Sequence, residues 1–341
     1  MRSARARALA VGLTFCGLAG LDGSSASAAP DACATSASIS PCFDADPWWI
    51  PTGPTPFAGI PSARTLAPGS LAFALGASVS IDPVVLVTAA PHPDGQEIDV
   101  VSATSTATLA ARYGLGRGVD IAVAVPFVPY QTGASTESVT SQAGATLEAV
   151  ALRDPRLGFA ATLFGRRGDA PLLLGTHLDL ALPFGTAHAL AGAPGPTLAP
   201  GFVGELHLGR WEAALDVGAR FTRAVRFGTV SEGSTAVIAL GAALTVLESP
   251  KLAFAFETTL RPALVAPPAG APSGALDLPA EWLASVRFEP TDAWSLLLGA
   301  GTGLPLSRAR SPGATSESVL AVTSPAFRGL FTARYTLPSF F

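Results

Sequence analysis

Two pairs of histidine and carboxylate residues have a spacing that could support catalysis or metal binding. His177 and Asp179 are two residues apart, and so are Glu205 and His207. Residues two apart lie on the same face of a β-strand, so each pair would project in one direction, as in a hydrolase that uses a serine or a metal. A catalytic triad is defined by its geometry, however, and the chain contains no nucleophile motif of the GxSxG type. We therefore expect no enzyme, no catalytic residues, no bound metal and no cofactor.

The elements that would position these pairs are segments in which large apolar and small residues alternate. In residues 71–81 the odd-numbered positions are Leu, Phe, Ala, Val or Ile, and the even-numbered positions are Ala, Gly or Ser. The pattern recurs in residues 119–127 and 235–246. In a soluble sheet the second face is wet and usually rich in Lys, Glu and Arg. Here that face carries mainly small residues, which indicates that the large apolar face does not pack a soluble core.

The composition points to an apolar environment. The chain is 49% hydrophobic and only 13% charged, with a mean hydropathy of +0.42, whereas soluble domains carry about 25% charged residues. After the first 28 residues, no stretch approaches the roughly 18 uninterrupted apolar residues of a spanning helix. A closed barrel is the remaining way to satisfy every backbone group in lipid. The sequence therefore predicts an all-β fold, a transmembrane antiparallel up-and-down β-barrel.

Residues 69–341 divide into about 12 strands of suitable length for a bacterial outer-membrane barrel. The predicted ranges are 70–82, 98–113, 119–130, 156–165, 171–184, 201–209, 211–225, 235–247, 251–264, 279–289, 293–304 and 326–337. Short connections alternate with long loops, notably 131–150, 185–200, 265–278 and 305–325. Such barrels pair short periplasmic turns with longer extracellular loops, so both ends of the barrel chain are expected on the periplasmic side.

Strand parity places a set of charged residues on the inner face, as candidates for lining a lumen. They are of both signs: Arg112, Asp120, His177, Asp179, Glu205, His207, Glu212, Asp216, Arg220, Arg226, Glu257, Arg261, Glu281, Arg287, Arg328 and Arg334. One interpretation is a salt-bridge network that fixes the strands, and the other is a selectivity lining of the kind that charged rings provide in channels. Alternating signs suit internal pairing better than ion selection, which favours the structural interpretation.

Glycines occur in two runs that need a separate explanation. Gly114, Gly116 and Gly118 form a hairpin turn and not a dinucleotide-binding loop, because a strand follows them. The glycines at 299, 301 and 303 face inward in one strand, where they could permit curvature, the close packing of a neighbour's large side chain, or a wider pore.

The first 68 residues precede the barrel. Arg2, Arg5 and Arg7, the apolar run 8–21 and the small residues 26–28 form a signal peptide, which we expect to be cleaved after residue 28 without lipidation. Residues 29–68 are predicted to be an irregular, proline-rich periplasmic extension, either loosely placed or tucked into the barrel mouth. Export permits a disulfide between Cys33 and Cys42. The tryptophans at 48 and 49 could anchor the chain at the membrane interface or pack the extension, and the flanking prolines favour packing.

Several segments resemble a known family. Residues 151–159 (ALRDPRLGF), residues 110–115 (AARYGL) followed by 124–127 (AVPF), and residues 279–282 (PAEW) are similar to the N-terminal barrel region of myxobacterial-type OmpA-family outer-membrane proteins, and more distantly to outer-membrane transporter barrels. The resemblance covers most of residues 42–341. It implies an integral outer-membrane barrel, here without the peptidoglycan-binding domain that follows the barrel in those relatives.

The sequence thus leads to an expected location and two competing roles. We expect export to the bacterial outer membrane, with membrane lipids and the barrel assembly machinery as partners and no nucleic acid. The favoured role is a narrow pore or transporter for the passive passage of small solutes. The alternative is a non-conducting structural or surface-interaction barrel that presents its long loops.

Overall fold

The structure is a computed structural model of the 341-residue chain. It describes residue 40 and residues 42–88, 96–136, 147–165, 170–227, 230–265, 278–304, 320–322 and 324–339. Asp31–Phe341 form one compact unit, which contains the whole barrel. The predicted signal peptide, Cys33 and Phe341 lie outside the described residues. Within these ranges, no helix has both the length and the apolar character needed to cross a membrane.

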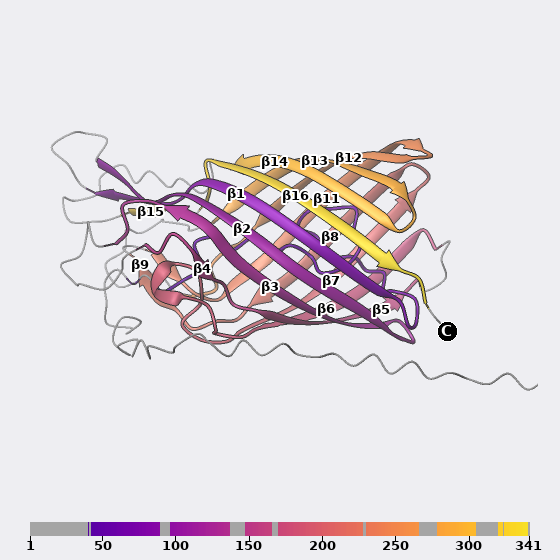
Figure 1. Cartoon of the computed structure of the whole chain (residues 1–341), viewed down its shortest axis with the longest axis horizontal. Helices are drawn as coiled ribbons and strands as arrows, with labels where there is room; N and C mark the ends of the chain where they lie inside the picture. The colour runs from indigo at the N-terminus through magenta and orange to yellow at the C-terminus, as the bar shows by residue number, and fades with distance from the viewer. Residues whose placement is uncertain are drawn as a thin grey trace, which may run out of the picture. The chain divides into compact units, whose positions relative to one another are not determined.

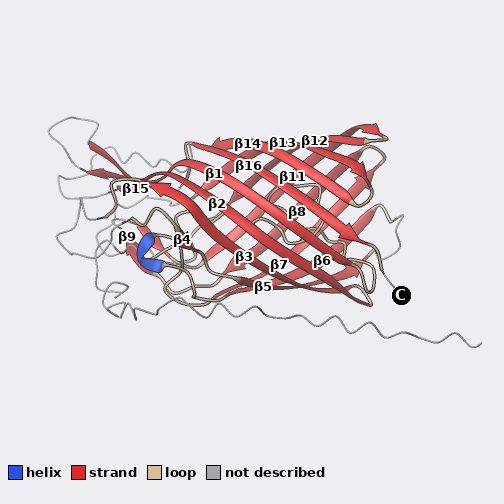
Figure 2. Ribbon diagram, in the orientation of Figure 1, coloured by secondary structure: helices blue, strands red, loops and turns tan. Residues whose placement is uncertain are grey.

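The described strands close into an antiparallel barrel (Figures 1 and 2). The main sheet has 14 strands, of which β4 and β15 only border β3 and β1, so 12 strands form the ring. Strand β1 pairs with both β2 and β16, which closes it. The 12 are β1 (Leu71–Thr88), β2 (Gln96–Gly116), β3 (Val119–Thr132), β5 (Arg156–Phe164), β6 (Leu172–Ala181), β7 (Thr197–Leu208), β8 (Trp211–Arg220), β11 (Thr235–Glu248), β12 (Lys251–Leu260), β13 (Ala280–Thr291), β14 (Trp294–Gly303) and β16 (Phe327–Leu337). The predicted all-β antiparallel barrel of 12 strands is confirmed.

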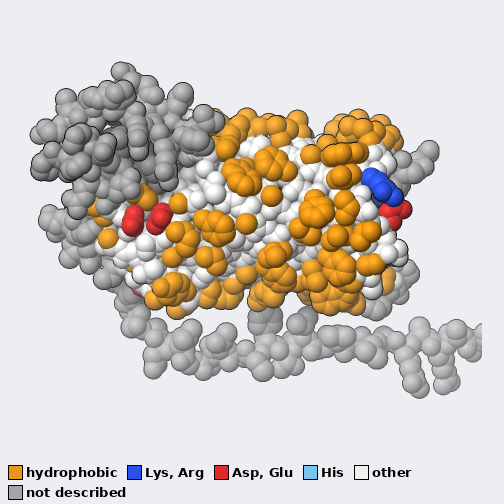
Figure 3. Space-filling model, turned by 90° about the horizontal axis from the view of Figure 1, so that it is seen from above, with side chains coloured by type: hydrophobic (Ala, Val, Ile, Leu, Met, Phe, Trp, Pro, Cys, Tyr) orange, Lys and Arg blue, Asp and Glu red, His pale blue; other side chains and the backbone are white. Residues whose placement is uncertain are grey.

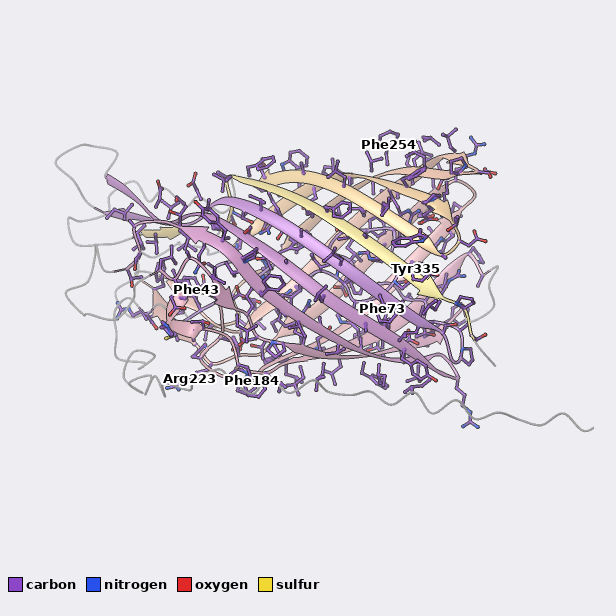
Figure 4. All side chains as sticks on the ribbon, in the orientation of Figure 1. Phe43, Phe73, Phe184, Arg223, Phe254 and Tyr335 are labelled. Atoms are coloured by element: carbon purple, nitrogen blue, oxygen red, sulfur yellow. The ribbon has the colours of Figure 1, made fainter. Side chains whose placement is uncertain are left out.

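The outer face of the barrel is apolar, as the alternation predicted. Along β1, Phe73 is 44% exposed and its neighbours Ala72 and Ala74 are buried inside. Apolar side chains cover the face drawn in Figure 3, and the charged side chains visible there lie near the two ends. Phe73 and Phe254 come from different parts of the ring, and both are exposed on its outer surface (Figure 4). An outer face of this composition suits contact with lipid, where every backbone group is already paired within the closed sheet.

The two ends of the barrel differ in their connections. At one end, which we call the short-turn end, the connections include two-residue turns at 117–118, 209–210, 249–250 and 292–293. At the other end, the long-loop end, lie the extra elements β4 (Ala151–Leu152), the 3-10 helix η1 (Ala187–Ala189), β9 (Val225–Phe227), β10 (Val230–Glu232) and β15 (Leu320–Val322). Strands β1 and β2 extend farther at this end than predicted, because residues 84–88 stay paired with residues 96–101.

Residues 42–68, which we call the lumen segment, are the main described part of the extension predicted at 29–68. The sequence leaves its position open, either loosely placed or tucked into the barrel mouth, and in the structure the segment runs through the interior of the barrel. Phe43 packs at the long-loop end against Phe227, with ring centroids 4.8 Å apart. Phe57 and Ile60 are buried against inward-facing residues of β6, β7, β8, β11 and β12. At the other end of the barrel, the backbone N–H of Gly69 donates to the carbonyl of Gly114, 2.9 Å away.

Two properties of the sequence explain this placement. The large apolar side chains of the lumen segment each gain about 1.5–3 kcal/mol from burial, and its prolines exclude it from a regular β-ladder. The wall offers small residues to receive these side chains. A Cβ added at Gly76 would lie 2.4 Å from Ile50 Cδ1, and one at Gly241 would lie 2.5 Å from Phe57 Cε1. The small inner face therefore accommodates the chain's own N-terminal segment.

The glycine run in β14 has a different explanation. A Cβ added at Gly301 would lie 1.8 Å from the carbonyl oxygen of Trp282, in the neighbouring strand β13. Of the roles considered for this run, close packing explains Gly301, but the neighbouring group is backbone and not a large side chain.

Candidate functional site

The candidate functional site is the interface between the lumen segment and the inner wall of the barrel. Wall carboxylates meet backbone N–H groups of residues 58–66. Glu257 accepts hydrogen bonds from Ala58 and Gly59 at 2.7 and 2.8 Å. Glu205 accepts one from Ala63 at 2.8 Å. An irregular backbone leaves these donors without ladder partners, and a buried donor without a partner costs about 1–3 kcal/mol.

Asp120 binds the last part of the same stretch. Its carboxylate accepts the backbone N–H of Leu66 at 2.9 Å, and it also pairs with Arg112 at 3.3 Å. Asp120 is fully buried. The carboxylate thus joins the lumen segment to a wall arginine near the short-turn end.

Arginines meet the backbone carbonyls of residues 46–57. Arg153 donates to the carbonyl of Asp46, and Arg220 donates to that of Pro47. Two more follow along the segment: Arg156 donates to the carbonyl of Ile50 at 3.2 Å, and Arg334 donates to that of Thr55 at 3.1 Å. Positive wall side chains therefore contact backbone carbonyls, and negative ones contact backbone N–H groups.

The long-loop end holds a network of buried ion pairs around Asp46. Arg328 contacts Asp46 at 2.8 Å and Glu281 at 2.7 Å, and Arg261 also binds Glu281. Arg153 pairs with Asp46 at 3.6 Å and with Asp44. Charged side chains of both signs thus hold one end of the lumen segment against β13 and β16.

The pKa values of the two aspartates in this network are shifted in opposite directions. Burial alone would raise the pKa of Asp46, but the guanidinium groups of Arg328 and Arg153 lower it to about 2. For Asp44 burial has the larger effect and raises the pKa, although Arg153 acts against it. The arginines of the network therefore stabilise the ionised form of Asp46.

The two wall histidines, His177 and His207, each lie beside carboxylates. His177 Nε2 lies 2.9 Å from Asp216 and its Nδ1 lies 3.6 Å from Asp179. His207 Nε2 lies 3.2 Å from Glu205. Both nitrogens of His177 thus face carboxylates, and neither faces a serine. Among the residues that the structure describes, no three His, Cys, Asp or Glu side chains gather as they would around a metal ion.

The predicted inward-facing residues fall into three groups by what they contact. Asp120, Glu205, Glu257, Arg220 and Arg334 bind the backbone of the lumen segment. Glu281, Arg261 and Arg328 belong to the network at the long-loop end. Seven others form ion pairs with wall residues, and these are Arg112, His177, Asp179, His207, Glu212, Asp216 and Arg287. Arg112 also packs against Gly53 of the lumen segment. The remaining residue, Arg226, was also placed on the inner face, but it lies in β9, outside the ring of 12 strands.

Sequence reasoning missed four charged residues of this interface. Asp44 and Asp46 were overlooked because the parity argument covered strands and not the extension. Arg153 was overlooked because it precedes β5 in a loop. Arg156 could have been found, since it begins the predicted strand 156–165 with the same parity as the inward-facing Ala160.

The double tryptophan packs inside the barrel and does not lie on its surface. Trp48 is 6% exposed, and the Arg328 guanidinium lies 5.2 Å from the centre of its ring. Trp49 lies between Arg156 and Arg220, at 4.7 and 4.0 Å. Cys42 is disulfide-bonded, but its pairing with Cys33 stays a prediction because Cys33 is outside the described residues.

Comparison with known proteins supports the fold only. No protein-family model matches the chain, and no curated protein sequence does either. The specific resemblance to myxobacterial OmpA-type barrels therefore has no support from a family match. Among solved structures, the chain is similar to the COG4313 outer membrane channel from Pseudomonas putida F1, with a TM-score of 0.54 and 14% identity over 81% of this chain and 98% of that one.

Two other solved structures are more distant. The KdgM porin in complex with oligogalacturonate has a TM-score of 0.43 and 8% identity, covering 78% of this chain and 98% of that one. The toluene transporter TodX of P. putida has a TM-score of 0.43 and 11% identity, covering 80% and 91%. At these levels of identity the likeness to the COG4313 channel shows a shared barrel fold.

Proposed function

We propose that this chain is an outer-membrane channel for small solutes, and that its own lumen segment closes it. The apolar outer face and the 12-stranded ring are what a membrane barrel requires. A ring of this size lies between small barrels filled by wall side chains and wide porins. The COG4313 protein is by its name an outer membrane channel, which agrees with this role.

One observation carries the proposal. Within the described ranges, residues 46–66 form no β-ladder with the wall, and they contact it through side-chain hydrogen bonds, ion pairs and apolar packing. The 12 strands pair with one another around the complete ring without this stretch. The segment can therefore move out of the lumen without breaking the hydrogen bonds of the barrel.

Export and insertion form part of the same proposal. The signal peptide at 1–28 would direct export, and the barrel assembly machinery would recognise the chain through its last strand. The myxobacterial OmpA-type relationship also belongs here, supported by the segments that resemble that family. Membrane lipids would contact the outer face, and the long loops would face the cell exterior.

The second candidate is a non-conducting structural or surface-interaction barrel. The observation in its favour is the filling of the lumen, where Phe57, Ile60 and Trp48 are buried against the wall. A permanently filled barrel would present its long loops and pass no solute.

Solute permeation separates the two candidates. Purified protein is reconstituted into liposomes, and swelling is measured in isotonic solutions of small sugars, amino acids and carboxylates. A channel closed by its lumen segment predicts little swelling with the wild type. When the segment is weakened, it predicts swelling with solutes of low molecular mass and a cut-off as size increases. Folded protein that allows no swelling, even in a variant with a weakened lumen segment such as Phe57→Ala, would support the non-conducting barrel.

A further inference from the structure

Two cavities remain beside Trp49, between the lumen segment and the wall. Their volumes are about 110 and 90 Å³. Their linings share Trp48, Trp49 and three arginines, namely Arg156, Arg220 and Arg261. The interior is therefore not completely filled at the point where the arginines of the wall gather.

Two of these arginines lack a carboxylate partner among the described residues. Arg156 is 4% exposed, and its Nε atom has no hydrogen-bond partner there. Its contacts are the carbonyl of Ile50 and the ring of Trp49. Arg220 similarly contacts the carbonyl of Pro47 and the ring of Trp49. Arg261 differs from both because it pairs with Glu281.

The carboxylates that line these cavities already have partners. Asp44 is bound to Arg153. Asp154 accepts backbone N–H groups of Gly185 and Ala193, each at 2.8 Å.

In the second cavity, the carboxylates are Asp179 and Asp216, and both flank His177. Glu232 lines the first cavity and has an interaction of its own. Of the three arginines that the two cavities share, Arg156 and Arg220 are thus the ones for which no carboxylate among the described residues lies at ion-pair distance.

We propose that these cavities form a binding site for a small organic carboxylate, held by Arg156 and Arg220. A guanidinium presents parallel N–H donors that match a carboxylate, and a buried charge without a counter-ion is costly. The ring of Trp49 supplies an apolar surface for the carbon chain of the ligand. The site lies in the lumen, so it rests on the proposed channel and names its substrate class.

The size of the site limits the ligand. A buried cavity of about 150 Å³ is known to hold benzene. The larger cavity here, of about 110 Å³, has room for a monocarboxylate of about two to four carbon atoms.

Binding is tested by calorimetry on the refolded full-length barrel in a neutral detergent. The probes are acetate, propionate and butyrate, with propionamide and propylammonium as neutral and cationic matches at equal ionic strength. We expect saturable binding of the carboxylates only. Loss of both arginines in Arg156→Gln/Arg220→Gln should weaken it by about 100-fold, that is about tenfold for each charged hydrogen bond. Arg210→Gln removes an exposed arginine at a short turn and should leave binding unchanged.

The possible outcomes separate this inference from the proposed channel. No saturable carboxylate binding to the wild type, equal binding of propionamide, or unchanged binding in the double variant would each overturn it. If the double variant does not fold, Arg220→Gln is measured alone, because Arg220 is only half-buried, and it should weaken binding by about tenfold. Carboxylate binding by the wild type without liposome swelling in Phe57→Ala would contradict the channel and keep the site, whereas swelling of that variant without carboxylate binding by the wild type would do the reverse.

Discussion

The two halves of the lumen segment are held in opposite ways. Residues 46–57 are bound through their carbonyls by arginines, whereas residues 58–66 are bound through their N–H groups by carboxylates. The first half also has the ion-pair network of Asp46, and the second half has the apolar contacts of Ile60 and Ala63. An irregular chain inside a barrel therefore needs wall charges that complement its backbone carbonyl and N–H groups, and not only charges that pair with one another.

Breaking the network in the first half should have the largest effect. Arg328 is fully buried between Asp46 and Glu281. Arg328→Gln leaves both carboxylates poorly compensated and should lower the free energy of unfolding by about 3–5 kcal/mol. Urea unfolding of the refolded barrel, followed by tryptophan fluorescence, measures this. The control Arg210→Gln, at an exposed pair with Glu248, should change it by about 0–1 kcal/mol. Equal effects of the two substitutions would show that the network does not hold the segment.

The second half should be weakened by neutralising Glu257. Its carboxylate accepts two backbone N–H groups of the segment, and hydrogen bonds to a charged group contribute about 1.5–3 kcal/mol. Glu257→Gln keeps the size of the side chain but leaves one acceptor oxygen for the two N–H groups, so we expect a loss of about 1–3 kcal/mol. The same urea titration measures it, with the exposed Glu248→Gln as the matched control. A loss no greater than that of the control would mean that Glu257 does not hold residues 58–59.

A side chain added where the two halves meet should push the segment away from the wall. Gly241 faces Phe57 and Ile60 at contact distance, so Gly241→Val should cost about 1–3 kcal/mol through overpacking. Gly204→Val provides the control, since the nearest atom to its added Cβ would be Leu174 Cδ2 at 3.4 Å. Thermal unfolding compares the two variants. A Gly241→Val protein as stable as the control would argue that the segment does not contact β11.

Acid should loosen the first half through Asp46. The pKa of Asp46 in the folded protein is about 2, below its ordinary value of 3.8, so its contribution to stability is present above about pH 4 and is lost as the pH falls through about 2. Burial raises the pKa of Asp44, which gives that residue the opposite dependence. The slope of stability between pH 4 and 2 should therefore become smaller in Asp46→Asn. An unchanged slope would show that Asp46 does not cause the loss of stability in acid.

Much of the barrel could be predicted from the sequence because the alternation of residue types along each strand depends only on neighbouring positions. The period-2 alternation of β1 depends only on which side of the sheet each residue faces, and the positions of Phe73 and Ala74 agree with it. The strand ends were less predictable. Residues 182–184 and 221–225 continue an apolar pattern, but β6 ends at Ala181 and β8 at Arg220.

The lumen segment could not be placed from the sequence. Its path depends on contacts across about 200 residues of chain, such as Ala58 with Glu257, and no periodicity reveals such contacts. Parity found Glu257 and Arg334 on the inner face but gave no partner for them. The extra signal was present in the extension itself, where Trp48, Ile50, Phe57 and Ile60 are too apolar for a loose periplasmic tail.

The central claim is that the lumen segment closes the barrel, and single-channel recording in a planar bilayer tests it most directly. The variant Phe57→Ala/Glu257→Gln weakens the segment from inside, and Phe254→Ala/Glu248→Gln makes the same changes at exposed positions. The wild type and the exposed control should stay closed or open rarely, and the inner variant should show frequent openings of higher conductance. Equal conductance and open probability in all three folded proteins would contradict the claim.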